Sequence, residues 1–238
     1  MGQSSIRKRA SIAILASLVA MAALASCAGQ KNPAEPLRVQ GKRFSLRLVP
    51  GPEYKATSWW LIFPIPIYPQ VACWIETPRG EYIDTLYVTA KGAKKTWVSA
   101  PAGGRPEALP VWSSLMSKQK ASADTVSGAT PSGVTTSDSP LAATLPNGKY
   151  IVKLEVNRSY DYNERYTRAN SGVTGQPSLI YECAIDLGSG PSKAAFTPIG
   201  TGSVDGSDGD IRQGLEGITS ALKLLESADI SYVERTTE

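Results

Sequence analysis

The chain has 238 residues, 42% of them hydrophobic, which is enough to build a buried core and excludes a wholly disordered protein. It contains no histidine, so a Ser-His-Asp triad, a Cys-His dyad and histidine-ligated zinc or haem are excluded. Its 21 glycines and 17 prolines follow no three-residue period, which excludes collagen and favours a turn-rich β protein.

The first 26 residues have the composition of a bacterial signal peptide. The basic residues 7–9 precede an apolar run over residues 12–24, which is shorter than the ~20 residues that span a bilayer. The following Leu24-Ala25-Ser26-Cys27 resembles a lipobox, in which the cysteine is acylated and cleavage falls before it. We predict a lipoprotein signal peptide over residues 1–26 and a polar tether over residues 27–42. The alternative is an ordinary signal peptide with an incidental cysteine.

The charge balance of the mature chain argues against nucleic acid as a partner. The 25 basic residues fall to 22 without Arg7, Lys8 and Arg9, and they face 21 acidic residues. Nucleic-acid binding needs clustered positive charge, which a chain of net charge +1 does not indicate. We expect the protein on the periplasmic side of a bacterial cell envelope, with its lipid anchor in the inner or the outer membrane.

Alternating apolar and polar residues predict a series of short strands. We expect strands at residues 43–48, 71–75, 82–89, 150–156, 179–187 and 230–233, and a helix at residues 215–226. A turn at Pro78-Arg79-Gly80 makes the second and third strands a hairpin. The predicted fold class is all-β: an antiparallel Ig-like β-sandwich over residues 43–238, with one short C-terminal helix and a long exposed loop.

Two segments depart from the alternating pattern. Residues 59–69 (WWLIFPIPIYP) are strongly apolar, but their three prolines exclude a central strand. They predict either an edge segment in polyproline conformation that covers the core or a patch facing a membrane or a partner. Residues 117–140 are rich in Ser, Thr, Ala and Gly, and we interpret them as the long exposed loop.

The sequence does not decide whether the two cysteines other than Cys27 form a disulfide. An exported protein can keep a bond between Cys73 and Cys183. Two buried free thiols are the alternative, because an unpaired cysteine behaves as a small hydrophobic residue.

Residues 124–130 (DTVSGAT), within the predicted loop, carry a recognisable signal. They match without exception the D-x-x-[ST]-G-[AS]-T sequence at which bacterial flavin transferases attach FMN to a threonine. The motif thus resembles that of FMN-carrying subunits of the sodium-pumping NADH:quinone reductase and related electron-transport complexes. The resemblance implies that Thr130 is esterified through the FMN phosphate. The alternative is a chance match in a biased loop.

The resemblance also suggests roles for the other motif residues. Asp124 is expected to be a docking handle or a metal contact in the transferase complex, and Ser127 fills the hydroxyl position of the motif. Gly128 and Ala129 add little bulk, so the chain can enter a foreign active site. We expect the flavin to rest on the Trp112 ring, for which a core position is the alternative. We predict no catalytic side chain and no metal site in the chain itself.

A second resemblance covers more of the chain. It is to an uncharacterised family of predicted periplasmic proteins, whose members often occur with membrane redox proteins and whose fold looks like a β-sandwich. Residues 59–69 and the C-terminal helix-like segment depart from it. The residues that carry it are Trp74-Ile75-Glu76, Gly80, Thr85-Leu86-Tyr87, Trp97, the run from Gly104 to Trp112, the turn from Leu145 to Tyr150, Glu155, and Gly175-Gln176-Pro177-Ser178.

Together these features predict a flavoprotein of electron transport. We expect a lipid-anchored extracytoplasmic protein with FMN covalently attached to Thr130, a redox carrier or accessory subunit more than a stand-alone enzyme. Its expected partners are a flavin transferase, membrane redox proteins and the membrane that holds the anchor. The alternative function is a non-catalytic Ig-like binding or scaffold lipoprotein.

Overall fold

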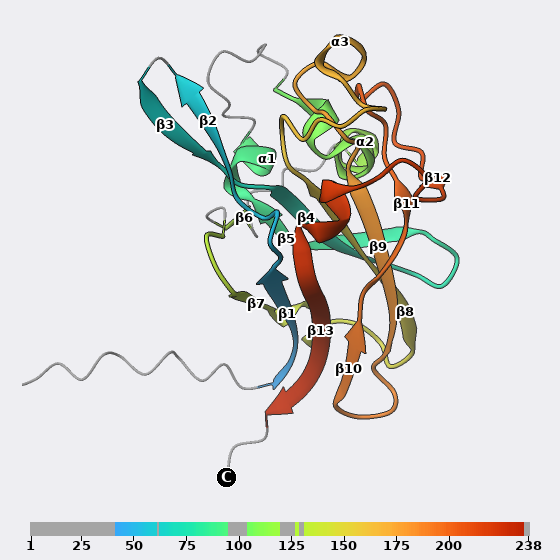
Figure 1. Cartoon of the computed structure of the whole chain (residues 1–238). Helices are drawn as coiled ribbons and strands as arrows, with labels where there is room; N and C mark the ends of the chain where they lie inside the picture. Colours follow the sequence, from blue (N-terminus) through green and yellow to red (C-terminus); the bar gives the residue numbers. More distant parts are fainter. Residues whose placement is uncertain (1–40, 61, 95–103, 120–126, 129–130, 236–238) are drawn as a thin grey trace, which may run out of the picture. The chain divides into compact units, whose positions relative to one another are not determined.

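The computed structural model describes residues 41–60, 62–94, 104–119, 127–128 and 131–235 (Figure 1). They fall within one compact unit, Val39–Glu238. The predicted signal peptide, Cys27 and all but the last two residues of the predicted tether lie outside the described residues.

Two sheets, antiparallel at every strand pair but one, contain all but two of the strands in the described chain (Figure 1). The larger sheet has the strand order β12-β11-β9-β8-β4-β5-β6, and the smaller one has the order β10-β13-β1-β7. The strands of the larger sheet are β4 (Gln70–Glu76), β5 (Tyr82–Thr89), β6 (Ser127–Gly128), β8 (Lys149–Asn157), β9 (Leu179–Asp186), β11 (Thr197–Thr201) and β12 (Arg212–Gln213). Those of the smaller sheet are β1 (Gly41–Pro50), β7 (Thr135–Ser139), β10 (Ser192–Ala195) and β13 (Leu225–Arg235).

The predicted all-β sandwich is confirmed, because the apolar faces of the two sheets enclose a common core. Alternate residues of β8, from Tyr150 to Val156, face this core together with residues of β1 and β13. The hairpin predicted around Gly80 is present as β4 and β5, and Gly80 has a positive φ of 82°, which favours glycine.

The outer face of the larger sheet is also covered, which the strand pattern did not predict. Helix α2 (Pro110–Gln119) follows the 3₁₀ turn η1 (Pro106–Ala108) and packs against this face. The second core so formed contains Ala72, Trp74, Val88, Leu109, Val111, Trp112 and Ile180. Helix α1 (Ala90–Lys94) directly continues β5.

Three predicted segments differ from the structure. The helix expected over residues 215–226 is a 3₁₀ turn, η3 (Ser220–Lys223), because the chain from Leu225 onward pairs with β1 as strand β13. The loop expected over residues 117–140 includes the end of α2 and the strands β6 and β7, and it leads into the 3₁₀ turn η2 (Pro140–Ala143).

In the third segment (residues 59–69), residues 62–66 are exposed and do not cover the core, whereas Tyr68 packs against it. The segment forms most of a hairpin of β2 (Ala56–Trp60) and β3 (Phe63–Ile67), which is a two-stranded sheet of its own. The short helix α3 (Arg168–Ser171) completes the described elements. Among the described residues, no helix combines the length and apolarity needed to cross a membrane.

The two core cysteines are free thiols. Cys73 lies on β4 and Cys183 on β9, on opposite sides of β8, where they pair with Leu154 and Val152. Strands lie ~4.8 Å apart, so β4 and β9 are separated by about 9.6 Å, beyond the reach of a disulfide. Burial raises the pKa of the Cys183 thiol to about 12 and that of Cys73 well above its ordinary value.

We therefore predict that neither thiol reacts in the folded protein. Iodoacetamide at pH 8 should leave Cys73 and Cys183 unmodified, because both are buried and protonated, and should modify both in denaturant. The intact mass of a chain that lacks Cys27 measures this. Rapid alkylation of the folded protein, or an internal disulfide after oxidative purification, would contradict the arrangement.

Candidate functional site

Part of the flavinylation-like motif lies at an edge of the larger sheet. Ser127 and Gly128 form β6 and pair in parallel with Val88 and Thr89 of β5. The Ser-Gly pair is therefore bound to the sheet and does not lie at the tip of a free loop. Asp124, Ala129 and Thr130 lie outside the described residues.

Packing against Tyr87 favours glycine at position 128. A Cβ atom there would lie 2.8 Å from Cε2 of Tyr87, a contact that real side chains avoid. Tyr87 is buried, and burial raises its pKa to about 12, so its phenol stays neutral. Pro131 is buried as well. The two residues between Gly128 and Pro131 are thus flanked by positions that pack against the body of the protein.

Trp112 occupies the core position that was the alternative to a flavin platform. Its side chain packs between α2 and the larger sheet, and the residue is only 4% exposed. The indole Nε1 donates a hydrogen bond to Oγ1 of Thr85 on β5, with the two atoms 3.0 Å apart. Because the indole ring is buried between α2 and the outer face of the larger sheet, Trp112 has no free ring face on which a flavin could stack.

The carboxylate of Glu155 fastens α2 to the sheet. Its two oxygens accept hydrogen bonds from the backbone N–H groups of Val111 and Trp112, at 3.2 and 2.8 Å. The Ser178 hydroxyl donates a third, at 2.7 Å. These N–H groups belong to the first turn of α2, where a helix leaves donors unpaired and favours negative charge. Glu155 is fully buried, facing the second core.

Burial dominates the titration of Glu155. It raises the pKa of this carboxyl to about 7, although the three hydrogen bonds oppose the rise. A group of this kind can hold or release a proton near neutral pH. The alternation along β8 places residue 155 on the face opposite the apolar one. The sequence therefore offered no signal that a helix covers this residue.

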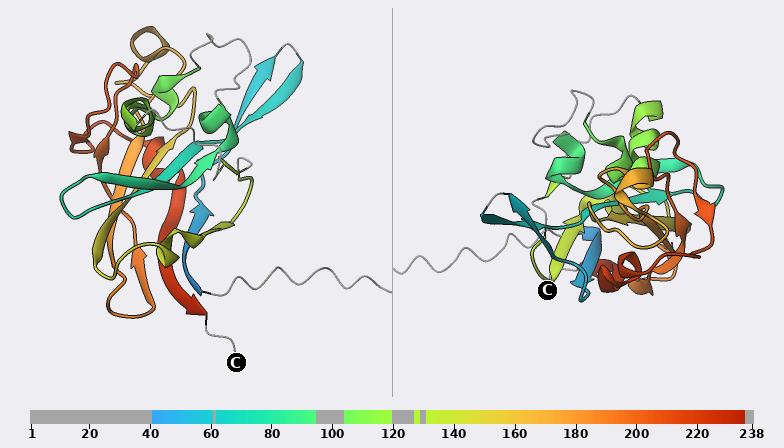
Figure 2. Two further views of the ribbon diagram at one scale, coloured as in Figure 1. Left: turned by 180° about the vertical axis from the view of Figure 1, so that it is seen from behind. Right: turned by 45° about the horizontal axis from the view of Figure 1, so that its top comes forward.

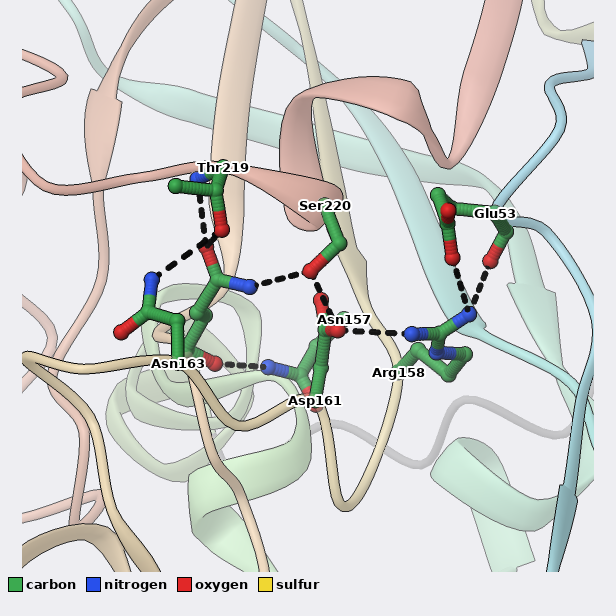
Figure 3. Close-up of polar contacts among 8 residues, drawn as sticks. Glu53, Asn157, Arg158, Asp161, Asn163, Thr219 and Ser220 are labelled. Carbon is green, nitrogen blue, oxygen red and sulfur yellow. Dashed lines mark hydrogen bonds and ion pairs between the residues drawn. The ribbon is translucent and has the colours of Figure 1, made fainter.

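A second polar cluster joins three separate loops (Figure 3). Arg158 donates to Oδ1 of Asp161 at 2.6 Å, and its other terminal nitrogen lies 3.5 Å from a carboxylate oxygen of Glu53. Ser220 also donates to Oδ1 of Asp161, at 2.6 Å. The Gln176 side chain links Ser220 to the backbone N–H of Thr219 in the same cluster.

This cluster fixes the chain where it enters the β2–β3 hairpin. Glu53 precedes β2, whereas Arg158 and Asp161 follow β8. Arg158 and Asp161 are both buried, so the pair resists separation. The described residues contain no group of three or more His, Cys, Asp or Glu side chains that could hold a metal ion.

The raised pKa of Glu155 predicts a specific pH dependence of stability. A folded-state pKa above the unfolded value stabilises the fold fully below about pH 4.5, and this contribution is lost as the pH rises through 7. The unfolding free energy of the native chain minus that of Glu155→Gln should therefore fall by roughly 3 kcal/mol between pH 4.5 and pH 8.

Chemical denaturation of both chains across this range measures the difference. The other titrating groups are common to both proteins and cancel. A difference that does not change with pH would show that Glu155 has an ordinary pKa.

Comparison with known proteins adds a family resemblance. Residues 67–176, a little under half of the chain, match a family described as predicted periplasmic protein (DUF2271). The match runs from the end of β3 past β8 and α3 and includes residues 124–130, but it leaves out β1, β2 and the strands from β9 onward. No curated protein and no solved structure matches the chain significantly. Over these residues the chain is thus similar to an uncharacterised family of predicted periplasmic proteins, in agreement with the resemblance found from its sequence.

Proposed function

We propose that the protein is an extracytoplasmic electron-transfer protein that carries FMN covalently on Thr130 and is anchored to a membrane by lipid on Cys27. The observation that carries this proposal is the complete motif at residues 124–130. The similarity to predicted periplasmic proteins supports the compartment in which such a carrier works.

The weak attachment of β6 to the sheet supports the proposal that a second protein can reach the motif. Among the residues that the structure describes, two pairs join β6 to β5, at the edge of the sheet. Each backbone hydrogen bond contributes about 1 kcal/mol, so a transferase can detach β6 at small cost. After transfer, β6 can pair again with β5, which returns the modified segment to the sheet edge beside Tyr87.

The proposed transfer needs one nucleophile from this chain. The Thr130 hydroxyl oxygen forms a bond to the FMN phosphorus of a flavin dinucleotide as the pyrophosphate bond breaks. The nucleotide leaves with its own phosphate, and a base of the transferase takes the hydroxyl proton. FMN then supplies one- and two-electron chemistry, while this chain supplies position. The proposed partners are a flavin transferase and membrane redox proteins.

A second candidate function is a non-catalytic binding or scaffold lipoprotein. The exposed apolar residues of the β2–β3 hairpin favour it, since large apolar side chains at a surface commonly contact a partner. This function would need no cofactor.

We predict that Thr130→Val abolishes flavin attachment. Produced together with a flavin transferase, the native chain should gain the mass of one FMN less one water. Thr130→Val should gain nothing, because valine lacks the hydroxyl but keeps the shape. Intact-mass spectrometry measures this, and Thr125→Val is the matched control, since it alters a variable position of the same motif.

Two results would count against the proposal. Covalent flavin retained by Thr130→Val would mean that another residue is the acceptor. A native chain without added mass, beside a transferase that modifies a known acceptor, would leave the binding lipoprotein as the function.

A further inference from the structure

The β2–β3 hairpin projects from the body of the protein (Figures 1 and 2). Its tip is apolar. Five residue pairs hold its strands together, from Ala56 with Ile67 to Trp60 with Phe63. The exposed fractions are 69% for Trp59, 79% for Ile62, 58% for Phe63 and 46% for Ile65. Exposed aromatic and branched side chains in one short segment are unfavourable in water.

The apolar residues lie on both faces of the hairpin and at its turn. Successive side chains of a strand point to opposite faces, so Trp59 and its partner Pro64 share one face, while Phe63 and Ile65 share the other. No charged residue occurs between Lys55 and Glu76. A flat protein partner would need one apolar face only, whereas an apolar medium that surrounds the tip makes use of both.

The outer edge of β3 is closed to a further strand. In an antiparallel pair, alternate residues direct their N–H groups toward the partner strand and away from it. Pro64 and Pro66 have no N–H, so they fit the outward positions and remove the donors from that edge. The edge therefore cannot add another strand. At positions 64 and 66 it also has no N–H group that would lose its hydrogen bonds to water in a lipid environment.

The base of the hairpin is both fixed and basic. Tyr54 is buried and packs against Tyr68, with ring centroids 6.3 Å apart, and Arg158 holds Glu53. Lys55 lies over the Tyr68 ring, 6.0 Å from its centroid. Helix α1 lies beside the hairpin base in Figures 1 and 2, and its Lys91 and Lys94 are exposed.

We propose that this hairpin inserts its tip into the surface of a lipid bilayer, with Lys55, Lys91 and Lys94 facing anionic headgroups. Five strand residues at about 3.3 Å each span roughly 16 Å, enough to reach the 5–10 Å depth at which interfacial segments bury their apolar residues. Aromatic tips with flanking lysines are typical of protein segments at membrane interfaces.

The lipid anchor of the proposed function places a bilayer within reach, and this one step rests on that proposal. Residues 28–40 between Cys27 and the first described residue span at most about 45 Å when fully extended. A second contact through the hairpin would set the orientation of the protein on the membrane, which a single point of attachment does not.

Vesicle binding of residues 28–238 tests the insertion independently of lipidation and flavin attachment. This chain lacks Cys27 and keeps the whole compact unit Val39–Glu238. An environment-sensitive NBD label at Ile62→Cys reports the tip, because Cys73 and Cys183 are buried. We expect a blue shift of its emission with vesicles of phosphatidylcholine and phosphatidylglycerol. We also expect Trp59→Asp/Phe63→Asp to weaken co-sedimentation of the unlabelled chain at least tenfold.

The control position is Val134, which is 61% exposed and lies outside the hairpin. Val134→Asp should bind vesicles as the unmodified chain does, and a label at Val134→Cys should not shift. Unreactive core thiols in each variant show that the fold is intact. The proposal is overturned if the label at position 62 does not shift, or if the double variant binds as tightly as the unmodified chain. Dimerisation through the hairpin, broken by the double variant, would overturn it as well.

Discussion

The hydrogen-bonded carboxylate of Glu155, buried beneath the first turn of α2, is the interaction on which the rest of the described structure depends. It satisfies donors at the helix terminus that have no partner inside the helix, and it does so from the central part of the larger sheet. Helix α2 in turn shields Trp74 of the sheet from water and buries its own Trp112 against it. Loss of this carboxylate would leave buried N–H groups unpaired, each costing about 1–3 kcal/mol.

Strand β5 contacts both this helix and part of the motif. Thr85 accepts the hydrogen bond of the Trp112 indole, and three residues later Val88 pairs with Ser127. The segment that contains residues 124–126 therefore connects two elements, α2 and β6, that are both attached to β5. A covalently bound cofactor on Thr130 would be carried on a short span whose flanks have defined positions. The proposed electron transfer to a partner would benefit from such positioning, because FMN would supply the redox chemistry and this chain the position.

The strands could be predicted because their apolar residues alternate and one sheet face is always buried, as in β8 and β9. The layer outside the sheet could not, since α2 has a weakly patterned sequence and its anchor, Glu155, looks like a solvent-facing residue of β8. The leucines of residues 215–225 have helical spacing, but pairing of β13 with β1 prevailed over it. The residues of the motif could be identified from the sequence. The pairing of Ser127 and Gly128 with the edge of the sheet could not, because it depends on tertiary structure.

The proposal of covalent FMN on Thr130 is best tested on the protein purified from the cells that produce it. Trypsin cuts after Lys120 and Lys149, so one peptide contains the whole motif together with every nearby serine and threonine. Tandem mass spectrometry of this peptide locates a modification at a single residue. We expect a peptide with FMN phosphate on Thr130. An entirely unmodified peptide, from cells whose flavin transferase modifies other proteins, would contradict it.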